Sequence, residues 1–387
     1  MKRVAVTGAG GSPAIGFARS LRAAPEEFHL IGFDTNPYTL QRAEVDERYL
    51  VPRVSDPDYL SVVSEILSET KPDLLHIQIS AEMIAVSGLR DRLPCRTFLP
   101  RHETILACED KFASYERWSA AGLKVPQTML LNNVADLQIA FERFGPRLWL
   151  RFTSGSAGRG ALPTSDYEEG KLWIDFHRGW GKFTAAECLE EQTITWQSIW
   201  KNGELVVAQG RKRMYWEFSN RARSGVTGIT GTGITVSDPL LDDVAQRAVL
   251  AVDPKPQGIF GVDLTYDKSG VPNPTEINIG RFFTTHHFFT AAGLNMPYIF
   301  VQCGLDAPLP HIPRKINPLT PGLAWVRGMD VLPTLTTTDD IEQSSLRLAK
   351  RRERLGKSLA DHTQGLTGSV CTEIVSSQGE LSRKQGS

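Results

Sequence analysis

The sequence has no long hydrophobic run and no excess of either charge. No segment reaches the roughly eighteen consecutive apolar residues of a membrane-spanning helix, and the first residues lack the apolar stretch of a signal peptide. The 43 Lys and Arg residues balance the 44 Asp and Glu residues, so the overall charge points to neither a nucleic acid nor a membrane surface. We therefore expect a cytoplasmic protein with no nucleic-acid or membrane partner.

Cysteine is scarce and scattered. The five cysteines never form a CxxC pair, so the usual spacing of zinc ligands is absent. Because they are also scattered along the chain, we do not expect a disulfide framework. This usage fits a reducing compartment. The 387 residues are enough for two or three domains with a large core, so we expect a soluble enzyme.

Residues 1–105 alternate between strand and helix patterns. Buried-strand runs at 3–7, 29–33 and 73–79 are separated by helical patterns at 15–23 and 57–70. Elements of these lengths in this order predict an α/β unit with a parallel sheet.

The first strand ends in the glycine-rich turn Gly8-Ala9-Gly10-Gly11-Ser12-Pro13, and Asp34 ends the second. A turn of this kind followed by an acid resembles a dinucleotide site, and an NAD(P)-dependent reductase is the alternative that it raises. The GxGxxG fingerprint nevertheless needs glycine or alanine at Pro13. No Tyr-x-x-x-Lys pair follows as a proton donor. Since a tight strand-to-helix turn binds many anions, the turn alone is weak evidence.

Residues 106–185 contain a second glycine-rich segment. Asp110-Lys111 opens an amphipathic helix, and a strand over 147–152 runs into a loop at 153–160 with three glycines and three hydroxyl residues. Such a loop brings backbone N–H groups close to phosphate oxygens, although a flexible hairpin has the same composition. Arg151 at the strand end favours a phosphate, because a guanidinium binds phosphate through two hydrogen bonds.

Residues 186–310 begin with strand patterns. A strand over 184–189 ends in Glu190-Glu191, and a hairpin turns at Asn202-Gly203. A basic cluster follows at 211–213, for which a solvated strand end is the alternative, especially at Arg211. An apolar helix is expected over 282–289, where His286 is interpreted as a packed core residue.

The segment 258–281 predicts a cation site. Two strand patterns, GIFGVDLTYD and PNPTEIN, are joined by a turn at 268–270. Glu276 and Asn278 are two residues apart and share a strand face, and the hairpin brings Asp263 opposite Glu276. Two carboxylates and an amide oxygen suit Mg²⁺, which leaves its other positions to phosphate and water. A solvated polar hairpin edge is the alternative.

These motifs, in this order over residues 1–305, resemble the ATP-grasp superfamily, in particular carbamoyl phosphate synthase large subunits and carboxylate–amine ligases. The resemblance implies a Rossmann-like pre-ATP-grasp domain at 1–105, followed by the two lobes of an ATP-grasp fold. It assigns 106–185 to a small lobe with a glycine-rich lid and 186–310 to a large lobe with the adenine hinge and the magnesium site. Residues 311–387 form a C-terminal extension.

The resemblance also implies site residues. Those for ATP are Lys111, Arg151, Ser154, Gly155, Ser156, Glu187, Cys188, Leu189 and Glu191. Those for the metal are Asp263, Glu276 and Asn278, and the catalytic cations are Arg281 and Arg213. Three positions depart from the family pattern, and one of them is the first basic residue, Lys111, which is a lysine as in many carboxylate–amine ligases. Thr193 stands near the usual ribose-binding glutamate, and Arg281 follows Asn278 by three residues where near relatives often have two.

The activity that the resemblance implies is ATP-dependent activation of a carboxylate as an acylphosphate, followed by attack of an amine. The expected cofactors are ATP and magnesium, with manganese as a substitute, and the partners are small-molecule carboxylates and amines; a homodimer is left open. A non-catalytic ATP-binding regulatory protein is the other alternative. Residues 339–359 predict a basic helix, either solvated or facing an acidic partner, and the polar sequence from His362 predicts a disordered tail.

Overall fold

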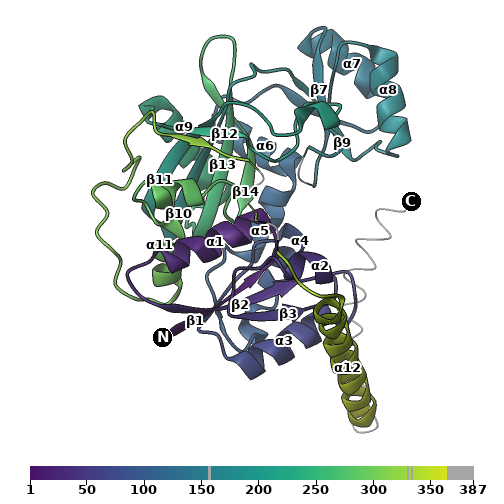
Figure 1. Ribbon diagram of the computed structural model, residues 1–387. Helices are drawn as coiled ribbons and strands as arrows, with labels where there is room; N and C mark the ends of the chain where they lie inside the picture. The colour runs from purple at the N-terminus through teal and green to yellow at the C-terminus, as the bar shows by residue number, and fades with distance from the viewer. Residues whose placement is uncertain (156–157, 329–330, 333, 364–387) are drawn as a thin grey trace.

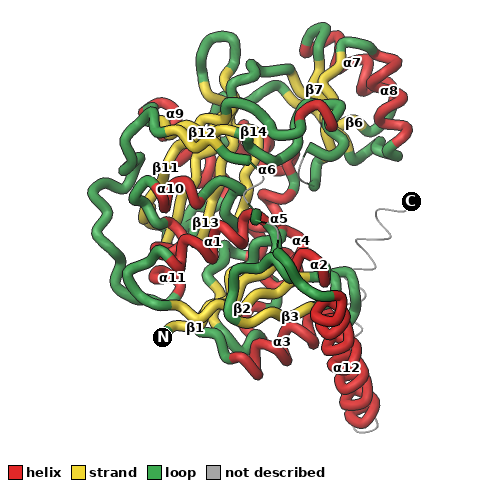
Figure 2. Tube along the Cα trace, in the orientation of Figure 1, coloured by secondary structure: helices red, strands yellow, loops and turns green. Residues whose placement is uncertain are grey.

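Three sheets form the framework of the protein (Figure 1). The structure is a computed structural model that describes residues 1–155, 158–328, 331–332 and 334–363. The described part contains a parallel sheet at the N-terminus, a small antiparallel sheet and a large antiparallel sheet, with helices packed on them (Figure 2). The predicted α/β class is confirmed.

The N-terminal sheet has the order β3-β2-β1-β4-β5, and all its pairings are parallel. Its central strand β1 is buried from Val4 to Thr7, as its apolar sequence predicts. The short strands β3 and β5 were not predicted, because both are polar and lie at the edges of the sheet. The elements are β1 (Lys2–Thr7), α1 (Ser12–Arg22), β2 (Phe28–Asp34), α2 (Pro37–Leu40), β3 (Glu47–Leu50), α3 (Tyr59–Thr70), β4 (Leu74–His76), α4 (Ser80–Ser87), η1 (Arg90–Arg92), β5 (Arg96–Thr97) and α5 (His102–Glu109).

The small lobe is a four-stranded antiparallel sheet in the order β6-β9-β7-β8. Helix α6, which leads into it, begins at Lys111 because the Asp110 carboxylate accepts hydrogen bonds from the N–H groups of Phe112 and Ala113. The elements are α6 (Lys111–Ala120), β6 (Thr128–Leu131), α7 (Val134–Phe144), β7 (Leu148–Phe152), β8 (Leu162–Thr164), α8 (Tyr167–Phe176) and β9 (Phe183–Glu187).

The large lobe is a six-stranded antiparallel sheet in the order β14-β13-β10-β11-β12-β15. The expected helix over 282–289 is wrong in extent, because α10 begins only at His287; His286 itself is fully buried, as expected. The elements are β10 (Thr193–Lys201), β11 (Glu204–Arg213), η2 (Ser219–Arg221), β12 (Thr232–Val236), α9 (Pro239–Val252), β13 (Gly258–Tyr266), β14 (Pro272–Ile279), α10 (His287–Ala291), α11 (Met296–Gly304) and β15 (Ala324–Val326).

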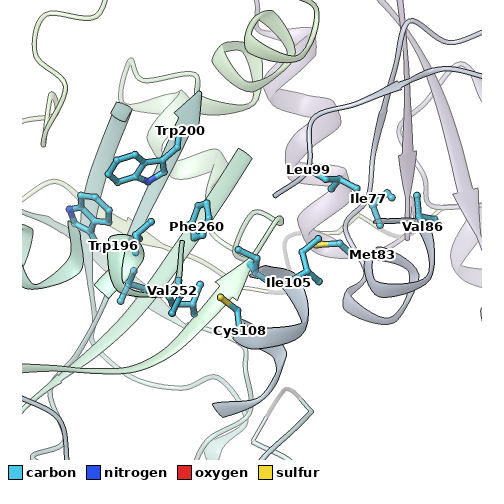
Figure 3. Close-up of a cluster of buried hydrophobic side chains, with 14 of the residues drawn as sticks. Ile77, Met83, Val86, Leu99, Ile105, Cys108, Trp196, Trp200, Val252 and Phe260 are labelled. Atoms are coloured by element: carbon cyan, nitrogen blue, oxygen red, sulfur yellow. The ribbon is translucent and has the colours of Figure 1, made fainter. Parts of the chain in front are cut away.

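The N-terminal sheet and the large lobe share their hydrophobic core. One cluster of buried side chains runs from Met83 and Leu99 through Ile105 to Trp196 and Phe260 (Figure 3). The small lobe has a separate cluster built around residues such as Leu150 and Phe183. Two of the three sheets therefore behave as one packed body, and the third has its own interior.

The C-terminal helix α12 (Thr338–Thr363) packs on the N-terminal unit. Arg351 contacts Glu65 and Glu69 at 2.8 and 2.7 Å, and Arg352 contacts Asp56 at 2.8 Å and Asp58 at 2.5 Å. The expectation of a solvated basic helix is thus wrong, because its arginines form ion pairs with acidic groups of the same chain. Residues 364–387, where the disordered tail was predicted, lie outside the described residues.

No helix among the described residues is long and apolar enough to cross a bilayer.

Candidate active site

The hairpin β13–β14 brings the predicted metal ligands together. Asp263 pairs with Glu276 and Gly261 pairs with Asn278, as the sequence predicts. A bulge between Asp263 and Leu264 adjusts the register, leaving Thr275 as the extra residue of β14. The two carboxylates and the amide consequently lie on one face of the large sheet.

Asp263 is the centre of a hydrogen-bond network. Its Oδ2 accepts from Asn278 Nδ2 at 3.0 Å, and its Oδ1 accepts from Thr195 Oγ1 at 2.5 Å. The Asn278 Oδ1 atom in turn accepts from Arg281 Nη2 at 2.8 Å. Arg281, predicted as a catalytic cation, is therefore joined to the carboxylate through the asparagine.

Lys111 and Arg151 reach the hairpin from outside its sheet. Lys111 Nζ lies 3.6 Å from Glu276 Oε1 and donates to the backbone oxygen of Gly155 at 2.6 Å. Arg151 Nη2 donates to the Thr275 oxygen at 2.9 Å, and burial lowers the pKa of Arg151. Both cations, predicted for phosphate binding, thus meet the strand that carries Glu276.

The glycine-rich lid lies against the large lobe. Ser154 and Gly155 belong to the described residues, whereas the predicted Ser156 lies outside them. Gly158 has φ +66°, and a Cβ there would lie 2.4 Å from the Val226 oxygen, so this approach requires glycine. A cavity of about 340 Å³ lies between the lid and the loop that joins β11 to β12.

A group of arginines surrounds the same face of the large sheet. Arg213 donates from Nε to Thr230 Oγ1 at 3.0 Å and from Nη1 to Thr193 Oγ1 at 2.7 Å. Its Nη2 lies 4.0 Å from Asp263 Oδ1. Lys212 lies between the two arginines of the basic cluster, so its side chain points to the opposite face of β11.

Arg211 corrects an expectation. It was assigned to a solvated strand end, yet it is 1% exposed. Its guanidinium donates to Thr230 Oγ1 and Thr195 Oγ1, both at 2.6 Å, and to Thr285 Oγ1 at 3.3 Å. Burial, followed by the neighbouring guanidinium of Arg213, holds its pKa well below the usual range.

Arg327, in the C-terminal extension, was missed by sequence reasoning. Its Nη1 donates to the Thr230 oxygen and its Nη2 donates to Ser12 Oγ, both at 3.1 Å. It therefore links the glycine turn of the N-terminal unit to the arginines of the large lobe. In the sequence, a single arginine after a short strand cannot be distinguished from an arginine on the protein surface.

The predicted adenine hinge joins the two lobes. Glu187 ends β9 in the small sheet, Cys188 and Leu189 follow it, and the next strand belongs to the large sheet. Burial raises the pKa of the Cys188 thiol, which favours the neutral thiol over the thiolate. Glu191 is exposed, and Thr193, at the expected ribose position, is bound to Arg213.

The donor set fits magnesium held jointly with phosphate. No cluster of three or more His, Cys, Asp or Glu side chains suitable for a metal occurs in the part of the chain that the structure describes. Asp263 and Glu276 supply two carboxylates and Asn278 supplies an amide oxygen. This small set of oxygens suits a cation that takes its remaining ligands from phosphates and water.

Three backbone amides of the N-terminal glycine turn donate hydrogen bonds to oxygens of the same unit. Ala9 N donates to the Phe33 oxygen at 2.9 Å, and Gly11 N donates to the Gly8 oxygen at 2.8 Å. Gly10 N donates to Asp34 Oδ2 at 2.9 Å, and a Cβ at Gly10 would lie 1.9 Å from the Thr39 oxygen. The glycines therefore serve close packing against α2, and Asp34 is occupied by the turn itself.

Solved structures share this fold at low sequence identity, although no family model matches the sequence. L-amino acid ligase from Bacillus licheniformis is 16% identical with a TM-score of 0.60, over 80% of this chain and 75% of that one. N5-carboxyaminoimidazole synthetase from Staphylococcus aureus, complexed with ADP, is 16% identical with a TM-score of 0.62, over 80% and 79%.

The biotin carboxylase domain of Hydrogenobacter thermophilus 2-oxoglutarate carboxylase is also similar. It was solved as a dimer with MgADP, ADP and bicarbonate, and it is 17% identical with a TM-score of 0.64, over 84% of this chain and 73% of that one. The agreement extends over four fifths of the chain or more in each of the three. The chain therefore has the ATP-grasp fold that the sequence motifs predict.

Proposed function

We propose that the protein is an ATP-dependent ligase that activates a carboxylate as an acylphosphate for attack by an amine. The observation that carries the proposal is the meeting of Lys111 and Arg151 with the Asp263, Glu276 and Asn278 face of the large sheet. Phosphoryl transfer needs this combination of charge neutralisation and alignment more than it needs a covalent side chain.

The charge balance favours two anionic substrates. Six cations are linked to this face (Lys111, Arg151, Arg211, Arg213, Arg281 and Arg327), against the two carboxylates of Asp263 and Glu276. Buried cations need counter-charge. A triphosphate would meet Lys111 and Arg151, and a substrate carboxylate would meet the arginines of β11.

The proposed reaction has two steps. A carboxylate oxygen of the substrate attacks the terminal phosphorus of ATP, the bond to the bridging oxygen breaks, and ADP leaves. The amine next attacks the acyl carbon, phosphate leaves, and the amine loses a proton to solvent. Magnesium on Asp263, Glu276 and Asn278 would supply further neutralisation of phosphate charge.

The remaining residues hold and protect the substrates. Arg281 and Arg213 would stabilise the charge of the transferring phosphoryl group and the acylphosphate. The lid, with Ser154 and Gly155, would exclude water from the acylphosphate, which hydrolyses if exposed. Glu187, Cys188 and Leu189 would meet the adenine at the junction of the lobes, and Glu191 is the proposed ribose contact. The fold similarity to nucleotide-bound enzymes supports this arrangement.

The first test is a screen of ADP release over pairs of small carboxylates and amines. Wild-type protein should release ADP with at least one pair, and Glu276→Gln should lower that rate by about a hundredfold or more while the protein stays folded. Glu204→Gln is the matched control, since Glu204 is exposed at the start of β11. Undiminished turnover in Glu276→Gln would remove the metal assignment.

The alternatives have their own signatures. Titration with Mg-ATP and with NADH should show binding of Mg-ATP, and preferential NADH binding would favour the reductase. Mg-ATP binding without ADP release over the whole screen would favour the non-catalytic regulatory protein.

A further inference from the structure

A second pocket lies in the N-terminal unit, outside the candidate active site. It has a volume of about 350 Å³ and follows the carboxyl ends of three parallel strands. Gly8 comes after β1, Asp34 ends β2, and Glu82 lies in α4 after β4. Since β1 separates β2 from β4, this is the point where the strand order reverses, a preferred ligand position in open α/β sheets.

Two guanidiniums and a carboxyl group of this pocket lack full partners among the described residues. Glu82 is 4% exposed; its carboxyl group is hydrogen bonded to Thr7 and Tyr59, but its Oε2 atom has no hydrogen-bond partner. Arg42 donates from Nη2 to the Gly10 oxygen at 3.1 Å, but its buried Nε has no partner. Arg53 is exposed at the same pocket. A buried polar atom left unpaired is costly, so the Nε atom of Arg42 and the Oε2 atom of Glu82 indicate a missing ligand.

The chemistry of the pocket disfavours a phosphate. The amides of Ala9, Gly10 and Gly11 already donate to Phe33, Asp34 and Gly8, so these three are not available to hold an anion. Asp34 and Glu82 place two carboxyl groups beside the two arginines, so the net charge is near zero when all four are ionised. The volume is near the lower end of about 300–1,000 Å³ for ligand pockets, which favours a small molecule.

We propose that this N-terminal pocket binds a free α-amino acid, with its carboxylate on Arg42 and Arg53 and its ammonium group on Glu82. Both charged groups of an amino acid would then meet a group of opposite sign, and the unpaired Oε2 atom would gain a donor. Burial raises the pKa of Glu82 to about 7, and an ammonium group beside the carboxyl group would lower this pKa again and favour the carboxylate.

The pocket borders the candidate active site through one residue. Gly11 lines the pocket, and the next residue, Ser12, accepts the hydrogen bond from Arg327. Amino-acid binding is nevertheless independent of the proposed ligase activity, because it needs neither ATP nor a metal. The two proposals can fail separately.

The test is calorimetric titration of the full chain, without nucleotide, with an equimolar mixture of the twenty common L-amino acids and then with each one. Wild-type protein should bind at least one of them. Arg53→Ala and Glu82→Gln should each weaken that binding by about tenfold or more, the loss expected for one charged hydrogen bond. Arg92→Ala, an exposed arginine of the same unit, is the matched control and should bind as the wild type does.

Three outcomes would overturn the proposal. They are no binding of any amino acid, binding that Arg53→Ala and Glu82→Gln both leave unchanged, and binding of inorganic phosphate or AMP at this pocket in place of amino acids. Arg53 is exposed, so its variant remains informative if Glu82→Gln folds poorly.

Discussion

Two pairs of cations approach the same face of the large sheet, and they differ in what satisfies them. The lid-side pair, Lys111 and Arg151, binds a carboxylate and backbone oxygens. The threonine-bound pair, Arg211 and Arg213, donates mainly to hydroxyl groups. A hydroxyl oxygen accepts a hydrogen bond but does not neutralise a positive charge.

The difference indicates different ligands. Lys111 already has Glu276 as a counter-ion and would exchange it for phosphate oxygens with magnesium bound nearby. Arg211 is almost fully buried, and among the described residues its negative counter-charge is Asp263, which it reaches through the Thr195 hydroxyl group and not directly. Because a buried guanidinium without a counter-ion is costly, it is the stronger pointer to a substrate anion. The following predictions test this division.

The largest effect is expected from Arg211→Met. Loss of a buried charged contact should lower kcat/KM for the carboxylate substrate by about a hundredfold or more, roughly 3 kcal/mol, and leave the Kd of Mg-ATP nearly unchanged. The midpoint of thermal unfolding should stay level or rise, because the variant removes an uncompensated buried charge. An equal loss of ATP affinity would instead assign Arg211 to the nucleotide.

A smaller effect is expected from Lys111→Met, and it should fall on the nucleotide and not on the carboxylate. The Kd of Mg-ATP should rise by about tenfold to a hundredfold, since a charged hydrogen bond contributes roughly 1.5–3 kcal/mol. The KM of the carboxylate should change little. Fluorescence titration with Mg-ATP and saturation kinetics with the carboxylate separate the two constants, and a rise in KM alone would contradict the division.

The smallest effect is expected from Arg352→Ala in α12. This arginine is 39% exposed and already paired with Asp56 and Asp58, so its loss should cost about 1 kcal/mol or less of unfolding free energy. ADP release should be unaffected. Urea unfolding at low and high salt measures the cost, and a drop in activity would show that α12 also influences the active site.

Much of the fold could be read from periodicity and turn chemistry. The start of α6, the limits of β7 and the turn of the β10–β11 hairpin follow the sequence patterns closely, because Asp110 caps α6 and Asn202-Gly203 closes the hairpin. The register of Asp263 opposite Glu276 was predicted as well, although the bulge that helps to set it was not.

The remaining features depend on contacts between distant segments. Nothing local distinguishes Arg211 from a solvated arginine, because its burial comes from Thr230 and Thr285. The partner of Arg327 lies 315 residues away, at Ser12. The sequence could not decide whether the glycine turn binds a dinucleotide or only allows close packing. The answer depends on the approach of Thr39 to Gly10, which only the folded chain shows.

The division of the hydrophobic core has a consequence for protein engineering. The small lobe has its own interior and joins the rest of the chain through two short junctions, one before Thr128 and one after Glu187. A small lobe from a related enzyme could therefore be exchanged without opening another core. The N-terminal unit offers no such freedom. Met83 and Leu99 pack in the same cluster as Trp196 and Phe260 (Figure 3), so a chimaera that replaces this unit must also redesign the large-lobe side chains that it covers.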